Sequence, residues 1–256
     1  MTRVFSVFAL TVWALLWQAP PTASVRTWLG RQPQIEAHLT QADVTSLEDI
    51  GTGVTHPRRA HLAPSTPVES FVWKVLPPSR RGGFWESYKS EIAAYELDKL
   101  LHLDMVPPAV ERRVGDDVGA AVMWLEGIRS VKELGGKVPA GAAWSRPIRK
   151  MLLFDNLIGN PDRNAGNILI GPPGEMILID HSRAFTDDRK LPNPIERVDA
   201  VLWERIRTLT REELTGAVGR WMDDDAIGAM IARRDRIGEI VDQLVKKKGR
   251  ALVIIP

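Results

Sequence analysis

The sequence predicts an α+β fold in two parts, a small β-rich part with one helix followed by a mainly helical part. Three observations predict it. Runs of β-branched and aromatic residues bounded by Gly and Pro lie before residue 127, one stretch of helical spacing interrupts them, and helical spacing dominates the remainder. We therefore expect the β-rich part over residues 40–126 and the helical part over residues 127–256.

The β-rich part contains apolar and β-branched runs separated by turn residues. Ile50–Thr55 is expected to be a strand that enters a glycine turn, and Arg59–Leu62 returns from it. Ser70–Leu76 reads as a strand closed by Pro77 and Pro78, with one cation inside it. The other expected elements are a helix over Phe84–Leu103 and a hairpin of Val110–Val114 with Ala120–Leu125.

Helical spacing prevails after Gly127. Arg146–Ile158 and Ala226–Lys247 carry apolar residues at helical spacing and are expected to be helices. Between them, Ile168–Ile170 and Met176–Ile179 are apolar runs on either side of a Gly- and Pro-rich turn. The sequence therefore predicts one hairpin within the helical part.

Composition excludes several classes of protein. The chain has 256 residues, 44% apolar and 26% charged, which is typical of one globular domain or two tightly joined lobes. The excess of 34 Lys plus Arg over 32 Asp plus Glu is too small for a protein that coats nucleic acid, so we expect no nucleic-acid partner. The absence of Cys excludes disulfides, thiolate zinc sites and cysteine nucleophiles.

Residues 1–24 have the order of a signal peptide. Arg3 precedes an apolar run from Val4 to Trp17, and small and Pro residues follow up to Ser24. The run is shorter than the roughly 20 residues that span a bilayer, which favours removal over anchoring. We expect a secreted, periplasmic or secretory-pathway protein; the alternatives are an uncleaved anchor, which would hold the chain near a membrane, and an N-terminal helix packed on the body.

The stretch from Asp155 to Asn167 and the following Asp180 carry the most informative motif. A loop after a helix supplies Asp162 and, five positions later, Asn167; the apolar hairpin then ends at Asp180. Phosphoryl transfer from ATP needs a carboxylate that accepts the proton of the attacking hydroxyl, with an amide oxygen and a second carboxylate that hold magnesium. The spacing equals the Asp-x-x-x-x-Asn of a kinase catalytic loop, and oxygen ligands suit a hard cation.

The run Asn160-Pro161-Asp162-Arg163-Asn164-Ala165-Gly166-Asn167 with Leu178-Ile179-Asp180 resembles the Asn-x-Asp-Arg-His-x-x-Asn and following Asp of atypical kinases. This group includes phosphoinositide 3- and 4-kinases, HipA-like toxin kinases and, closer in layout, the secretory-pathway casein-kinase family and its bacterial relatives. The resemblance covers roughly residues 50–185. It implies a two-lobed protein-kinase-like fold, with a β-rich N-lobe and a mainly helical C-lobe.

The resemblance also implies roles for single residues. Asp162 would be the catalytic base, Lys74 would pair with ATP phosphates, and Glu91 would hold Lys74. Asn167 and Asp180 would bind Mg²⁺ or Mn²⁺, and Gly51 and Gly53 would cover the phosphates. Met123, with Val122 and Leu125, would line the adenine slot, and Glu126 would begin the connection between the lobes. The chain departs from the pattern at Asn164, where His is usual, and at His181 after the metal-binding Asp.

Each residue also has a structural interpretation. Asp162 alone could cap a turn, and Lys74 could point to solvent if no anion meets it. Glu96 is the runner-up to Glu91 as the partner of Lys74. Asp155, on the apolar face of its helix, is expected to anchor the catalytic loop through its amides or Arg163.

The sequence therefore predicts a kinase that transfers the γ-phosphoryl group of ATP, with magnesium, to a hydroxyl on a protein, sugar or lipid. The alternatives are a nucleotide-binding pseudokinase and an enzyme of the same fold that transfers AMP or acts on a lipid or sugar. A non-catalytic binding domain of the cell envelope is a further alternative. The acceptor is not indicated, because the loops expected to recognise it have generic composition.

Overall fold

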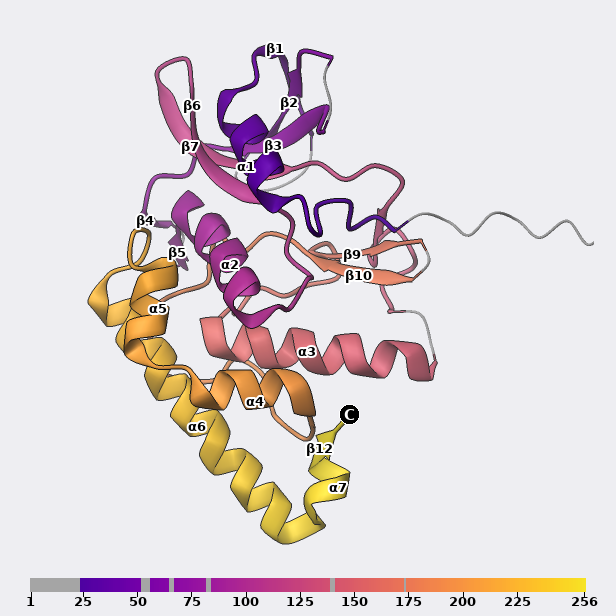
Figure 1. Ribbon diagram of the computed structural model, residues 1–256, viewed down its shortest axis with the longest axis vertical. Helices are drawn as coiled ribbons and strands as arrows, with labels where there is room; N and C mark the ends of the chain where they lie inside the picture. Colours follow the sequence, from indigo (N-terminus) through magenta and orange to yellow (C-terminus); the bar gives the residue numbers. More distant parts are fainter. Residues whose placement is uncertain (1–23, 52–55, 65–66, 82–83, 139–140, 173) are drawn as a thin grey trace, which may run out of the picture.

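A computed structural model describes residues 24–256 except 52–55, 65–66, 82–83, 139–140 and 173. The fold is mixed α+β, with a sheet region followed by a helical part, as predicted (Figure 1). Three predictions fall at least partly outside the described residues. These are the signal peptide or anchor, apart from Ser24, the strand expected over Ile50–Thr55, of which residues 52–55 are not described, and the phosphate-loop residue Gly53.

An antiparallel five-stranded sheet forms the first part, in the order β1-β2-β3-β7-β6. Its strands are β1 (Val44–Asp49), β2 (Arg58–Leu62), β3 (Ser70–Lys74), β7 (Asp117–Met123) and β6 (Ala109–Val114). Two helices, α1 (Gln32–Gln41) and α2 (Tyr88–Leu101), pack against β6 and β7. The short strands β4 (Ser79–Arg81) and β5 (Phe84–Glu86) form a hairpin that leads into α2.

Alternation along the strands divides the side chains between α1 and α2. On β7, Ala121 and Met123 join the apolar cluster that contains α1, while Ala120 and Val122 join the cluster that contains α2. The same alternation on β3 sends Trp73 toward α1 and Val72 toward α2. Lys74 follows Trp73, so its side chain leaves the sheet on the face that carries α2.

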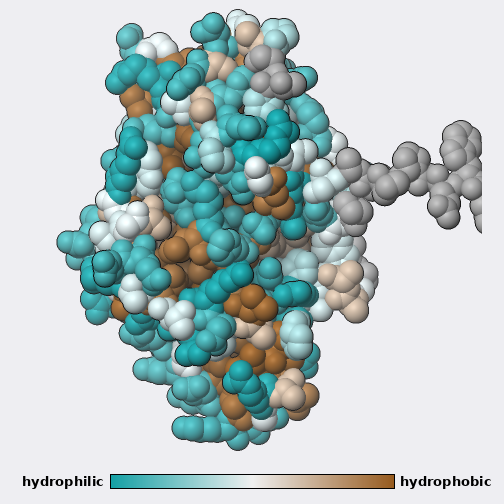
Figure 2. Space-filling view, viewed as in Figure 1, coloured by the Kyte–Doolittle hydropathy of each residue, from teal (hydrophilic) through white to brown (hydrophobic). Residues whose placement is uncertain are grey.

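The second part consists of helices and a small sheet. Its helices are α3 (Ala142–Ile158), α4 (Ala200–Thr208), α5 (Arg211–Val218), α6 (Asp224–Lys248) and α7 (Arg250–Val253). Its strands are β8 (Arg129–Ser130), β9 (Ile168–Gly171) and β10 (Glu175–Leu178), with β11 (Val198–Asp199) and β12 (Ile254–Ile255) as a separate parallel pair. Figure 2 shows that hydrophilic side chains cover most of the face in view and that apolar ones gather over its middle and lower parts.

A buried arginine joins α6 to the end of α3. The Arg233 side chain is 0% exposed; its Nε donates to the Leu157 carbonyl at 2.9 Å, and its Nη1 donates to the carbonyls of Thr186, at 3.2 Å, and Asp188. Burial lowers the pKa of this guanidinium to about 10. A Cβ at Gly159 would lie 2.8 Å from the Arg233 Cζ, so only glycine leaves room for this side chain.

The structure differs from the sequence prediction at several boundaries. The first strand runs over Val44–Asp49, and Ile50 and Gly51 lie outside it although a strand was expected to begin there; residues 52–55 of that expected strand lie outside the described residues. The helix expected from Phe84 begins at Tyr88, because the Ser87 side chain caps it by accepting the Lys89 N–H at 3.1 Å. Helices α1, α4, α5 and the short α7 were not predicted. Among the described helices, none is long and apolar enough to cross a membrane.

Candidate active site

Lys74 meets two carboxylates where the sheet faces α2. Its Nζ lies 2.6 Å from Glu91 Oε1 and 2.9 Å from Asp180 Oδ1. The three residues come from the end of β3, the first turns of α2 and the segment after β10. Glu96, the runner-up partner, instead pairs with Lys99 at 3.1 Å on another face of α2. The fold therefore brings together a lysine and two acids that lie up to 106 positions apart.

Burial and charge act against each other in this cluster. Burial opposes the charged form of Lys74, but Asp180 and Glu91 outweigh it, and the pKa of Lys74 is raised above its ordinary value. Burial alone would likewise raise the pKa of Glu91, but Lys74 and His181 outweigh it, and that pKa is lowered. Both groups are therefore charged at neutral pH.

Asp180 occupies a left-handed backbone conformation, with φ of 58°, between β10 and the buried His181. The Ser182 hydroxyl donates to Asp180 Oδ1 at 3.1 Å, the oxygen that also accepts from Lys74. Oδ2 is thus the oxygen left for a cation. The His181 ring packs edge-on against Phe154, and burial lowers its pKa, which suits a neutral neighbour of the site.

Arg163 fastens the loop that carries Asp162. Its Nε and Nη2 each bond one oxygen of Asp155 at 3.0 Å, and its Nη1 donates to the carbonyls of Asn167, at 2.8 Å, and Ile179, at 2.6 Å. Asp155 is fully buried and also accepts from Asn160 Nδ2 at 3.0 Å. The expectation that Asp155 anchors the loop through Arg163 is confirmed, and the loop is held against the strand end that leads to Asp180.

The loop orients Asn167 and Asp162 differently. Asn167 Nδ2 donates to the Asp162 carbonyl at 2.9 Å, which turns Oδ1 of the amide away as the remaining acceptor. The Asp162 side chain is 37% exposed, and its Oδ1 accepts from Asn164 Nδ2 at 3.3 Å. A carboxylate on the loop thus keeps access to solvent, while the neighbouring amide is nearly buried.

Arg183 and Glu86 are site residues that the sequence analysis missed. Arg183 Nε donates to Glu86 Oε1 at 2.9 Å, and Arg183 Nη1 donates to Asp162 Oδ2 at 3.2 Å. The Glu86 side chain is almost fully buried, and it precedes the cap of α2. The available signal was a single cation in the otherwise small and apolar run that follows His181.

The residues expected to contact the nucleotide lie after β1, at the end of β7 and in the segment that follows β7. Gly51, exposed and at φ of 69°, follows the end of β1, and Met123 lies buried at the end of β7. The Glu126 carboxylate is exposed and forms an ion pair with Arg59, whose guanidinium stacks over Trp124 at 4.3 Å. Arg59 was not singled out in the sequence.

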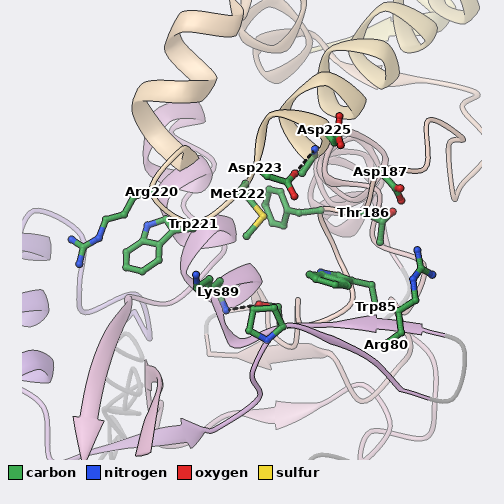
Figure 3. Close-up of a pocket in the computed structure, with 14 residues that line it drawn as sticks. Arg80, Trp85, Lys89, Thr186, Asp187, Arg220, Trp221, Met222, Asp223 and Asp225 are labelled. Atoms are coloured by element: carbon green, nitrogen blue, oxygen red, sulfur yellow. Dashed lines mark hydrogen bonds between the residues drawn. The ribbon is translucent and has the colours of Figure 1, made fainter.

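A separate pocket of about 480 Å³ lies where the β4–β5 hairpin and the start of α2 face the start of α6 (Figure 3). Trp85 and Trp221 line it, together with cations such as Arg80 and acids such as Asp187. None of Lys74, Asp162 or Asp180 is among its lining residues. It is therefore distinct from the acid and lysine cluster.

Several solved structures share this fold. Hydra Fam20, whose structure contains a sugar, matches with a TM-score of 0.71 and 17% identity over 88% of this chain and 92% of that one. The chain has a protein-kinase-like fold. The Golgi casein kinase matches with a TM-score of 0.69 and 14% identity over 87% of this chain and 78% of that one, and it has also been solved with Mn/ADP bound. The Helicobacter pylori proinflammatory kinase CtkA matches at 0.54 and 11% identity, over 84% of this chain and 99% of that one.

Sequence comparison adds less. No protein-family profile matches the chain. Protein Rv2133c of Mycobacterium tuberculosis is 29% identical over 115 residues, which is 45% of this chain. The matched region spans about a third, 34%, of the length of that protein.

The donor atoms fit a hard divalent cation. Asn167 Oδ1 and Asp180 Oδ2 are both oxygens, which Mg²⁺ and Mn²⁺ prefer. Among the described residues, no group of three or more His, Cys, Asp or Glu side chains is placed to hold a metal ion by itself. An amide and one carboxylate leave most of the coordination to phosphate oxygens and water, which is how Mg²⁺ is bound in phosphoryl-transfer sites.

Proposed function

We propose that the chain is an atypical kinase that transfers the γ-phosphoryl group of ATP to a hydroxyl acceptor. The observation that carries the proposal is the meeting of Lys74, Glu91 and Asp180 at bonding distance, beside a loop that presents Asp162. A lysine held in its charged form by two acids provides a fixed positive charge for phosphates. The protein-kinase-like fold supports the same interpretation.

On this proposal each residue has one task. Lys74 binds phosphate oxygens, Glu91 holds Lys74 in place, and Asp162 receives the proton of the acceptor hydroxyl. The hydroxyl oxygen forms a bond to the γ-phosphorus, the bond from that phosphorus to the bridging oxygen breaks, and ADP leaves. Most of the rate would come from positioning and fixed charge, which this set of bonded side chains provides.

Asn167 and Asp180 would hold Mg²⁺ or Mn²⁺, which neutralises charge on the phosphates when bound. The Golgi casein kinase, solved with Mn/ADP, supports this choice of metal and nucleotide. Gly51, Gly53, Met123 and Glu126 remain proposed nucleotide contacts. The proposed lobes meet near residue 126, and the proposed acceptor is a hydroxyl on a protein, sugar or lipid.

The test uses the full chain with ATP labelled in turn at the α- and γ-phosphate, with and without Mg²⁺ or Mn²⁺. We expect metal-dependent transfer or release of the γ-label alone. Asp162→Asn and Asp180→Asn should each lower the rate by at least about 100-fold while the thermal midpoint changes little. Undiminished release in both variants contradicts the proposal, and binding of ATP without turnover by the wild type indicates a pseudokinase. Transfer of the α-label indicates AMP transfer.

We further propose that the chain is exported by residues 1–24. The basic start and short apolar run support this, as does the fold shared with a Golgi kinase. A reporter enzyme that is active only after export, fused behind residues 1–24, tests it. Export should stop when two charged residues are placed in the run from Val4 to Trp17.

A further inference from the structure

The start of α2 is bonded to the segment that follows Asp180. Three hydrogen bonds join them: His181 N–H to Glu91 Oε2 at 3.1 Å, Ser87 N–H to the Ser182 carbonyl at 2.9 Å, and the Ser90 hydroxyl to the Ala184 carbonyl at 3.2 Å. Movement of α2 relative to the helical part would therefore move this segment or break these bonds.

Arg183 extends the same connection to the catalytic loop. Its guanidinium contacts Glu86 through two nitrogens, Nε at 2.9 Å and Nη2 at 2.8 Å, and reaches Asp162 Oδ2 through Nη1 at 3.2 Å. The side chain of Glu86 is 4% exposed and that of Arg183 is 22% exposed. A planar guanidinium can bind two carboxylates along fixed directions, so its orientation is set by the buried acid and imposed on the exposed one.

Strand β5 directs two neighbouring side chains to opposite sides. Trp85 points into the pocket shown in Figure 3, and Glu86, the next residue, points the opposite way toward Arg183. Ser87 then caps α2. The acid that holds Arg183 is thus fixed between a strand and a helix start.

We propose that Arg183, held by Glu86, is a positioning residue that orients the Asp162 carboxylate toward the acceptor hydroxyl. This rests on the proposed function, in which Asp162 is the base. The segment from the end of β5 into the first turn of α2 then controls both halves of the site: Glu91 fixes the lysine that binds phosphate, and Glu86 fixes the carboxylate that accepts the proton. Asn164 steadies the other oxygen, Oδ1, so each oxygen keeps one lone pair for the acceptor.

Substitutions in the phosphate-binding half and in the proton-accepting half of the site should have different kinetic effects. Glu91 acts through Lys74, so its loss should weaken nucleotide binding. Glu86 and Arg183 do not contact Lys74 in any described bond, so their loss should spare nucleotide binding and slow the chemical step. A purely structural role would instead lower stability and kcat and raise KM together.

The experiment uses the full chain and measures binding of MgATP by calorimetry and release of labelled phosphate. Arg183→Met and Glu86→Gln should each lower kcat roughly 10- to 100-fold with KM for ATP within about twofold. The double variant should have a kcat within about twofold of that of Arg183→Met, because the two residues act as a unit. Added methylguanidinium should restore part of the activity of Arg183→Ala. Arg189→Met, in the same segment and exposed, is the matched control and should match the wild type.

The outcomes distinguish this inference from the function on which it rests. A wild type that releases no phosphate overturns both. An active wild type with Arg183→Met and Glu86→Gln equally active overturns the positioning role alone. So does a loss of activity in which KM rises as much as kcat falls, or multiplicative losses in the double variant. Glu86→Gln keeps the shape of the side chain, so it remains informative if Arg183→Met fails to fold.

Discussion

Replacement of Lys74 by Met would leave Glu91 charged and without its cation. The Glu91 side chain is 3% exposed, whereas that of Asp180 is 38% exposed and can turn to water. The main cost therefore falls on Glu91, which keeps only the His181 N–H and the His181 ring as polar neighbours among its described contacts. Removal of one partner of a buried pair costs about 3–5 kcal/mol, and we expect the lower end, about 3 kcal/mol at pH 7.

The loss of unfolding free energy in Lys74→Met should depend on pH in a defined direction. In the wild type the pKa of Glu91 lies below its ordinary 4.5, so the stabilisation is complete above pH 4.5 and is lost as the pH falls through the folded value. The pKa of Lys74 lies above 10.5, so the stabilisation is also lost as the pH rises through that folded value. In the variant only His181 still opposes the effect of burial, so the pKa of Glu91 is higher than in the wild type, and protonation relieves the buried charge as the pH falls.

Unfolding in urea, monitored by tryptophan fluorescence, measures the loss of stability, since the chain has nine Trp. The difference in unfolding free energy between the wild type and Lys74→Met should narrow from pH 7 to pH 5. The double variant Lys74→Met/Glu91→Gln should recover about 1–3 kcal/mol relative to Lys74→Met at pH 7. A difference that stays constant with pH, together with a double variant no more stable than the single one, would refute the reasoning.

Two further substitutions probe the supports of the site. Gly119→Ala should lower the free energy of unfolding by about 1–3 kcal/mol and weaken ATP binding, because its Cβ would lie 2.3 Å from the Lys74 carbonyl oxygen. Gly216→Ala, in α5 with open space around it, is the control and should be neutral or stabilising in the same urea assay; equal effects would contradict the steric argument. Arg163→Lys should slow phosphate release roughly 10- to 100-fold, because a lysine cannot bond both oxygens of Asp155 and still reach the two carbonyls; a wild-type rate would show that the loop holds its shape without them.

The elements that the sequence predicted best are those with a strong local pattern. The apolar run of β3 with one cation and the helical spacing of α3 and α6 each identify an element without tertiary information. Lys74 within that run also indicated a nearby anion, because an unpaired charge is costly to bury. Helix α1 was missed because only Ile35 and Leu39 of its ten residues are buried, which leaves too thin an apolar stripe.

The part of the site that was missed depends on tertiary contacts. Glu86 and Arg183 are 97 positions apart, and nothing in either local pattern indicates the other. Strand β1 was not predicted at Val44–Asp49, because this stretch is mostly polar and almost entirely exposed, so burial alternation could not mark it. The Asp162 and Asn167 spacing gave the loop, while the orientation of each side chain came only from the folded contacts.

Arg233 connects the segment after Asp180 to α6, in the C-terminal part of the chain. Its guanidinium supplies the donors for three peptide carbonyls, two of them in the segment that leaves the site and one at the last turn of α3. A protein cut before residue 224 would have to hydrate those three oxygens in the middle of its own interior. Residues 224–256 therefore cannot be removed without leaving those carbonyls unpaired, although this stretch contains none of the residues assigned to the proposed site.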